Sequence, residues 1–173
     1  MSMRKIAVIF LTVGITPVAH ASTLCHADEV AVFSCQLKEN KKFVSVCTSR
    51  NISDKTGFMQ YRYGTEKNVE LSYPDDKLDS QSKFGYDSYD RPDLSTFILG
   101  FDNSNYRYEI SETTEGGADD GVTARALLVT SEVTKHTITL NCLNNQNLIS
   151  HISTLEAVVP CDKEHEIVDG SCN

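Results

Sequence analysis

The chain has 173 residues and a formal net charge of −8 at pH 7, from 16 lysine and arginine residues against 24 aspartate and glutamate residues. This acidic balance argues against a protein that binds nucleic acid or an anionic membrane surface by default, because both partners are themselves negative. A basic protein is the partner whose association such a charge accelerates.

The first 21 residues have the pattern of a cleavable signal peptide. Positive residues at 4–5 precede an apolar run at 6–18 and a small-x-small cleavage site at 19–21. An uncleaved anchor is the competing interpretation, but the apolar run is shorter than the roughly 20 residues of a membrane span. We therefore expect a signal peptide at 1–21 and a periplasmic single domain at 22–173, with no membrane anchor and a net charge of −10 (14 basic against 24 acidic residues).

Six cysteines follow the predicted signal peptide, which favours disulfide bonds because exported chains reach an oxidising compartment. A zinc site is the alternative, but the spacing contains no C-x-x-C and no paired histidines. Six cysteines allow 15 pairings, and we rank these by proximity along the chain. The predicted pairs are Cys161 with Cys172, Cys35 with Cys47, and Cys25 with Cys142.

Alternating apolar and polar residues predict four β-hairpins joined by polar turns. The first hairpin, centred on Lys41, would place Cys35 and Cys47 opposite each other. We also expect a short strand at 83–89 and a short helix at 147–155. The four predicted strand pairs are 30–38 with 43–49, 58–63 with 69–73, 96–101 with 106–110, and 122–130 with 136–142.

Consecutive hairpins with almost no helix predict an all-β fold, an antiparallel meander stabilised by disulfides. A short propeller, a barrel and a sandwich all fit this order of elements, and local patterns do not separate the three. The repetition concerns structure only, because the hairpins share no visible sequence identity.

Two features are candidates for contact with a partner protein. The segment 113–121 is acidic and rich in glycine, which is typical of an exposed loop. All seven tyrosines lie between Tyr61 and Tyr108, and tyrosine is a favoured contact residue, although cross-strand packing explains such residues equally simply. The predicted contact residues are Thr113, Thr114, Glu115, Asp119, Asp120, Tyr106 and Tyr108.

No common catalytic motif is present, so we expect a protein that is not an enzyme and that needs neither cofactor nor metal. A hydrolase with paired carboxylates remains an alternative, because acidic residues are plentiful. The acidic segment after Glu115 superficially suggests a calcium loop. It lacks the alternating oxygen ligands of such a site.

Four short stretches resemble a group of small secreted bacterial proteins with the word order VFSC…VS.C…QYRYG…ELxYP. The matching stretches are Val32-Phe-Ser-Cys35, Ser45-Val-Cys47, Gln60-Tyr-Arg-Tyr-Gly64 and Glu70-Leu-Ser-Tyr-Pro74. They cover about the first third of the predicted mature chain. The later stretches Ala124-Arg-Ala-Leu-Leu-Val129 and Leu140-Asn-Cys142 also suit this group.

In size, signal peptide and β-rich layout the chain is also similar to periplasmic immunity proteins of type VI secretion systems, which insert a loop into a peptidoglycan amidase. That resemblance implies an inhibitor of a cell-wall hydrolase, with segment 113–121 as the blocking loop. It rests on layout, so it carries over no individual residue. A lysozyme inhibitor is a neighbouring interpretation, and an envelope-associated module with a tyrosine-rich contact face is the alternative from another class.

Overall fold

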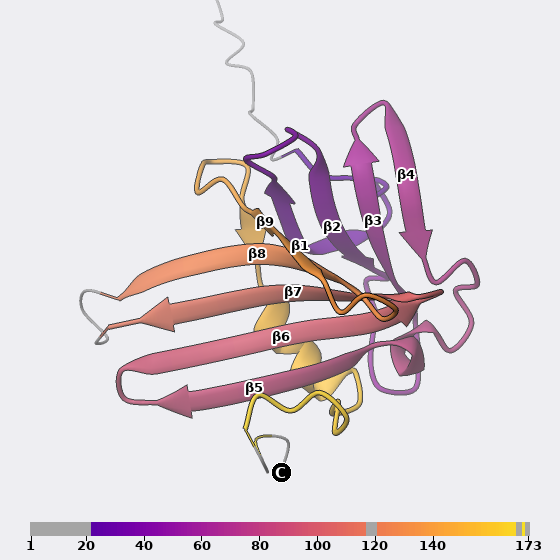
Figure 1. The fold of residues 1–173 in the computed structure, drawn as a ribbon. Coiled ribbons are helices and arrows are strands. Elements are labelled where there is room, and N and C mark those ends of the chain that lie inside the picture. The colour runs from indigo at the N-terminus through magenta and orange to yellow at the C-terminus, as the bar shows by residue number, and fades with distance from the viewer. Residues whose placement is uncertain (1–21, 117–120, 169–170, 172–173) are drawn as a thin grey trace, which may run out of the picture.

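The computed structural model describes residues 22–116, 121–168 and 171, so the predicted signal peptide lies outside the described part. Its architecture is a sandwich of two antiparallel sheets with five strands each (Figure 1). The first sheet has the order β10 (Ile149–Ser150), β1 (Val30–Gln36), β2 (Phe43–Thr48), β3 (Met59–Thr65) and β4 (Asn68–Tyr73). The second has the order β5 (Gly85–Arg91), β6 (Leu94–Asn103), β7 (Tyr106–Glu115), β8 (Val122–Ser131) and β9 (Thr137–Asn141).

The predicted all-β class is confirmed, and the strand pattern identifies all four hairpins correctly. They form β1–β2, β3–β4, β6–β7 and β8–β9, and the expected short strand is β5. Of the three architectures that fit the sequence, a short propeller, a barrel and a sandwich, the chain adopts the sandwich. In Figure 1 the strands of the first sheet run at a steep angle to those of the second.

Two predicted boundaries need correction. The segment 113–121 is not a loop throughout, because β7 continues to Glu115, which pairs with Val122 at the start of β8. The expected helix at 147–155 is instead the two-residue strand β10 followed by the 3₁₀ helix η2 (Ile152–Ala157). A second 3₁₀ helix, η1 (Ser80–Lys83), connects the two sheets. No helix in the described part of the chain is long and apolar enough to cross a membrane.

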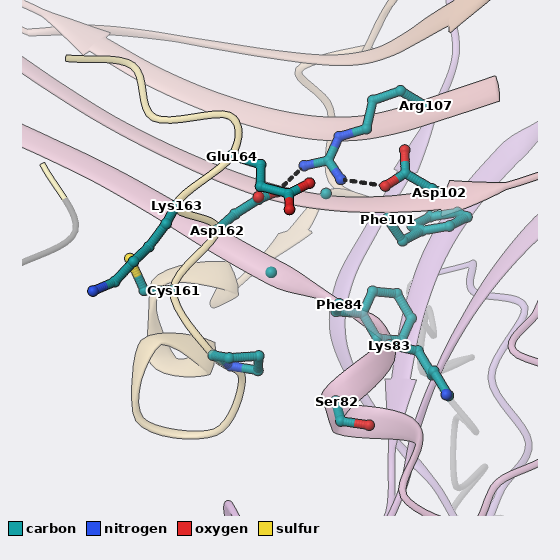
Figure 2. Close-up of a pocket in the computed structure, with 13 residues that line it drawn as sticks. Ser82, Lys83, Phe84, Phe101, Asp102, Arg107, Cys161, Asp162, Lys163 and Glu164 are labelled. Atoms are coloured by element: carbon teal, nitrogen blue, oxygen red, sulfur yellow. Dashed lines mark hydrogen bonds and ion pairs between the residues drawn. The ribbon is translucent and has the colours of Figure 1, made fainter. Parts of the chain in front are cut away.

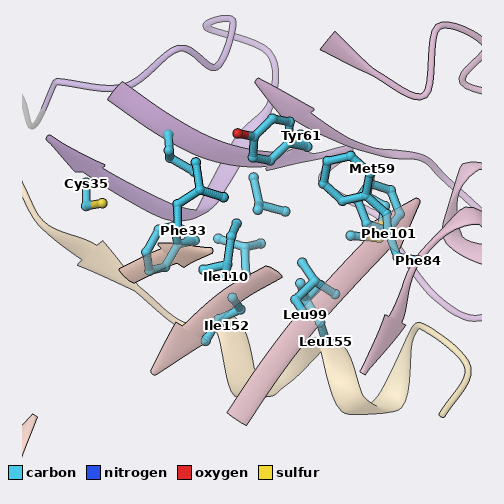
Figure 3. Packing of buried hydrophobic residues seen from close by; sticks show 14 of the residues in the cluster. Phe33, Cys35, Met59, Tyr61, Phe84, Leu99, Phe101, Ile110, Ile152 and Leu155 are labelled. Atoms are coloured by element: carbon cyan, nitrogen blue, oxygen red, sulfur yellow. The ribbon is translucent and has the colours of Figure 1, made fainter. Parts of the chain in front are cut away.

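The hydrophobic core fills the space between the two sheets (Figure 3). Side chains alternate between the two faces of a strand, so every second residue of each sheet points into this space. η2 closes the core with Ile152 and Leu155, which are at most 1% exposed. The fully buried residues also include Phe33, Val44, Val46, Met59, Tyr61, Leu99 and Ile110.

Both predicted disulfide pairings that lie within the described residues are wrong. The structure joins Cys25 to Cys47 and Cys35 to Cys142. The reason is the register of the first hairpin, in which Cys35 lies opposite Val44. Because Val44 and Cys47 are three residues apart, their side chains point to opposite faces of the sheet. Cys35 therefore faces the core and Cys47 the outer surface.

The Cys35–Cys142 bond joins the two sheets at one corner. Next to it, Leu37 forms an isolated antiparallel bridge with Cys142, and the Lys38 N–H donates to the Asn141 carbonyl at 2.8 Å. This corner makes the end of β9 continuous with the turn between β1 and β2. The predicted pair of Cys161 and Cys172 includes a residue outside the described part and stays a prediction.

Candidate functional site

The second sheet ends in two hairpin tips that lie side by side. Leu94 pairs with Glu115, and Glu115 pairs with Val122, so the β5–β6 and β7–β8 tips reach the same level. The Gly116 N–H donates to the Asp93 carbonyl at 3.0 Å and ties one tip to the other. We call the described residues 90–95, 113–116 and 121–123 the projecting end, because Figure 1 shows these strand ends reaching beyond the first sheet.

Most side chains of the projecting end are polar, on both faces, and the apolar exceptions are Leu94 and the exposed Val122 beside Glu115. Phe97 is the last buried apolar residue of β6 toward this end. Beyond it, the Thr96 hydroxyl bonds to Thr113 at 3.3 Å on one face, and Thr114 bonds to Thr123 at 2.9 Å on the other. Such cross-strand pairs stabilise a ribbon that has no sheet packed against it.

The projecting end is acidic. Its described residues include three carboxylates, on Asp90, Asp93 and Glu115, all exposed, against the single cation of Arg91. Arg91 lies 3.0 Å from Asp93, but both side chains are more than half exposed, so this ion pair is screened by solvent. The surface therefore presents a net negative charge on a hydrogen-bonded backbone.

The structure brings some of the predicted contact residues together and separates others. Thr113, Thr114 and Glu115 lie at the projecting end. Asp119 and Asp120 lie outside the described residues. Tyr106 begins the same strand, nine residues from Glu115, a distance of about 30 Å at 3.4 Å per residue. Tyr106 therefore belongs to another surface of the molecule.

Tyr108 and most other tyrosines from the centre of the sequence pack between the sheets. The Tyr108 ring stacks on Phe101 with centroids 5.0 Å apart, and Tyr73 stacks on the same phenylalanine at 4.3 Å. Tyr61 is fully buried beside Phe101 and Tyr108. Burial raises the pKa of the Tyr61 and Tyr108 hydroxyls above the usual value. These side chains serve packing in the first place.

Sequence patterns do not reveal the polar cluster on the outer face of the first sheet. Arg62 points away from the core, yet it is only 3% exposed, because the segment before β1 covers it. Its guanidinium donates to Glu29 at 2.6 and 2.8 Å, to Gln60 and to the Leu24 carbonyl. The disulfide between Cys25 and Cys47 fixes the same segment.

Glu29 is the acidic centre of this cluster. Burial on its own raises the pKa of this carboxyl, but hydrogen bonds from Arg62, from the His26 backbone and from Lys77 outweigh it and lower the pKa to about 2. Glu29 also lies near the sulfurs of Cys25 and Cys47. Both sulfurs are held in a disulfide, so this group lacks the thiolates that would bind a metal.

A second buried ion pair lies under the C-terminal segment and lines a cavity of about 350 Å³ (Figure 2). Arg107 on β7 is 6% exposed and pairs with Asp162 and Asp102. Burial raises the pKa of Asp162, but His165 and Arg107 outweigh that effect and lower it. Arg107 also lies 3.6 Å from Glu109, so its charge is compensated within the protein. We read this cluster as a clamp for the C-terminal segment.

Comparison of the chain with known protein families, with curated proteins and with solved structures found no match. The candidate site is therefore assigned from its geometry, with the projecting end as the surface that the fold leaves without a structural role.

Proposed function

We propose that the chain is a periplasmic inhibitor that blocks a peptidoglycan-degrading enzyme by placing its projecting end in the active cleft. The leading candidate for the partner is a cell-wall amidase delivered by a type VI secretion system, for which this chain would be the immunity protein. The observation that carries the proposal is the pair of hairpin tips, which are joined by the Gly116–Asp93 hydrogen bond and reach beyond the first sheet (Figure 1).

Rigidity and charge both support this use of the projecting end. A ladder-paired tip loses less conformational entropy on binding than an unpaired loop does, so more of the contact energy appears as affinity. The acidic groups of Asp90, Asp93 and Glu115 would speed the approach to a basic cleft. Backbone carbonyls and threonine hydroxyls supply hydrogen-bond acceptors and donors at the tip.

Two alternative functions would involve a different binding partner. An envelope-associated module that uses a tyrosine-rich face is less favoured, because Tyr61, Tyr73 and Tyr108 pack in the core. A lysozyme inhibitor would use the same projecting end on a different hydrolase. Only the identity of the inhibited enzyme separates it from the leading proposal.

The test is inhibition of wall lysis by the oxidised chain that begins at Ser22, assayed against a panel of cell-wall amidases and lysozymes. We expect stoichiometric inhibition of one enzyme, and a loss of at least tenfold in potency in the variant Asp93→Asn/Glu115→Gln. The matched control is Asp54→Asn/Glu66→Gln, which removes two exposed carboxylates outside the second sheet. It should retain inhibition.

Three results would contradict the proposal. If every enzyme of the panel lyses cell walls at its normal rate in the presence of the chain, the chain is not an inhibitor of these enzymes. Equal loss of potency in both variants would mean that net charge matters and the projecting end does not. Turnover of peptidoglycan by the chain itself would make it an enzyme.

A further inference from the structure

The two outer edges of the second sheet differ in how they are protected. On the β5 edge the C-terminal segment pairs with Tyr86, whose N–H donates to the Pro160 carbonyl at 2.9 Å and whose carbonyl accepts from Asp162 at 2.7 Å. On the other side, β9 is the last strand and has no neighbouring strand in the described structure. We call residues 137–139 of β9 the open edge.

Backbone directions along β9 follow from its hydrogen bonds to β8. The Cys142 N–H donates to the Arg125 carbonyl, and the His136 carbonyl accepts from Ser131. Because these directions alternate along a strand, residues 136, 138, 140 and 142 face β8 and residues 137, 139 and 141 face outward. The open edge therefore presents the N–H and C=O groups of Thr137 and Thr139.

The outward groups of Asn141 are already used. Its N–H donates to Glu39 at 3.0 Å, and its carbonyl accepts from the Lys38 N–H at 2.8 Å. The turn between β1 and β2 thus closes the edge at this end. At the other end the chain turns away at Lys135, which has a positive φ of 56°. The free part of the edge is three residues long.

The open edge lacks most of the devices that usually prevent strands from pairing between molecules. Natural edge strands are protected by charged residues, proline, a bulge, a covering loop or short length. The sequence Thr137-Ile-Thr-Leu-Asn141 has no charge, proline or bulge, and its free part is limited only by its length of three residues and by the turn that covers Asn141. Ile138 is 53% exposed although it lies on the face that packs the core elsewhere. An uncharged edge with an exposed aliphatic side chain favours an additional strand.

The open edge is complementary to itself about a two-fold axis at Ile138. Antiparallel pairing about this axis places Thr137 of one copy opposite Thr139 of the second copy, and the reverse. Both positions offer outward N–H and C=O groups, so the arrangement forms four backbone hydrogen bonds. The two Ile138 side chains meet at the centre and become buried against each other.

The charges next to the open edge also fit this arrangement. The same register places Lys135 of one copy beside Asn141 of the second copy, which is held by the Glu39 carboxylate. Lys135, which is also ion-paired with Glu132 of its own copy, therefore lies near a glutamate of the second copy at both ends of the paired strands. This complementarity favours a second copy over an unrelated strand as the occupant.

We propose that the protein forms a two-fold dimer in which the two β9 strands pair and the second sheets join into one sheet of ten strands. Antiparallel pairing points the two projecting ends in opposite directions, so each stays accessible to a partner. The dimer interface and the proposed inhibitory surface are separate, and either can fail without the other.

A cysteine variant tests the register directly. Ile138→Cys places two sulfurs across the axis in a pair whose Cα atoms are about 4.5 Å apart, which suits a disulfide bond. We expect a disulfide-linked dimer of Ile138→Cys on a non-reducing gel. Thr139→Cys is the matched control, because in this register its sulfurs are too far apart to join, and it should remain unlinked.

Analytical ultracentrifugation over a range of concentrations tests the association itself. We expect a concentration-dependent dimer for the wild type and a monomer for Ile138→Lys and for Thr139→Pro. Proline has no backbone N–H, so Thr139→Pro removes one of the outward hydrogen-bond donors of the open edge. Val69→Lys changes an exposed valine on β4 and should still form dimers. Circular dichroism checks that each variant is folded.

A wild-type chain that stays monomeric would overturn the proposal, as would a dimer that survives both Ile138→Lys and Thr139→Pro. A monomer that loses binding of a hydrolase in the Thr139→Pro variant would assign the open edge to a strand of that partner. Loss of dimerisation with wall-lysis inhibition retained would separate this proposal from the proposed function.

Discussion

Arg62 and Glu29 form a two-point ion pair, with nitrogen–oxygen distances of 2.6 and 2.8 Å, in which both side chains are at most 3% exposed. Glu29 precedes β1 and Arg62 lies in the middle of β3, so the pair fastens the start of the described chain to the outer face of the first sheet. Gln60 and the Leu24 carbonyl complete the hydrogen bonds of the guanidinium.

The first prediction concerns acid stability. The pKa of Glu29 is about 2 in the folded protein against 4.5 in the unfolded chain, so the stabilisation is complete above pH 4.5 and is lost as the pH falls from 4.5 to 2. At 1.36 kcal/mol per pKa unit this amounts to about 3 kcal/mol. Urea unfolding between pH 6 and pH 2.5 measures the loss.

The variant Glu29→Gln provides the control. It leaves the Arg62 charge buried without its partner, which costs about 3–5 kcal/mol at neutral pH. The same variant should lose less stability than the wild type on acidification. A wild type and a variant with parallel pH profiles would contradict the assigned role of Glu29.

The second prediction ranks the two disulfides. The Cys35–Cys142 bond spans 107 residues and the Cys25–Cys47 bond spans 22. Chain entropy then gives about 4.8 and 3.4 kcal/mol of stabilisation. Cys35→Ala/Cys142→Ala should therefore unfold at lower urea concentration than Cys25→Ala/Cys47→Ala, and the opposite order would indicate that strain or residual structure dominates.

The third prediction concerns the space that Gly100 leaves for Arg107. A Cβ atom at Gly100 would lie 2.0 Å from one Arg107 nitrogen and 2.6 Å from its Cζ. Gly100→Ala should therefore displace the guanidinium from Asp162 and lower the stability by about 1–3 kcal/mol. In the background Arg107→Ala the same substitution should cost much less, and equal costs in both backgrounds would contradict this contact.

The fourth prediction uses the Tyr61 hydroxyl, which is buried and has no hydrogen-bond partner among the described residues. An unpaired buried hydroxyl carries a desolvation cost of about 1–3 kcal/mol. Tyr61→Phe keeps the ring contacts with Phe101 and Tyr108 and removes this cost. The melting temperature should rise, whereas Tyr73→Phe serves as a control with a smaller change.

Local patterns were enough to predict the hairpins, because alternation and turn residues act within a few positions of each other. Predicting the disulfide pairing also required the exact register of the first hairpin. An offset of one and a half residues in the centre of the first hairpin puts Cys35 opposite Val44, and this offset reverses the face on which its partner must lie. Turn sequences at Lys41 do not fix a register that closely.

The candidate site was predictable in part. Thr113, Thr114 and Glu115 are at the projecting end, but the sequence suggested a loop where β7 continues its ladder with β8. The sequence did not reveal the burial of Arg62, because a charged residue that alternates with aromatic residues along a strand normally faces solvent. Only the covering segment, fixed by Glu29 and Cys25, changes that environment, and such coverage depends on contacts far apart in the sequence.

The pairing of β10 with β1 sets an order of assembly on a chain made from its N-terminus. Cys25 and Cys47 can meet once the first two strands exist, whereas Phe33 and Ser34 wait for Ile149 and Ser150, the last strand to be made. Until then the β1 edge is open, and until Cys142 has been made Cys35 is a thiol without its native partner. A nascent chain of this kind needs protection from other molecules until its final strand closes the first sheet.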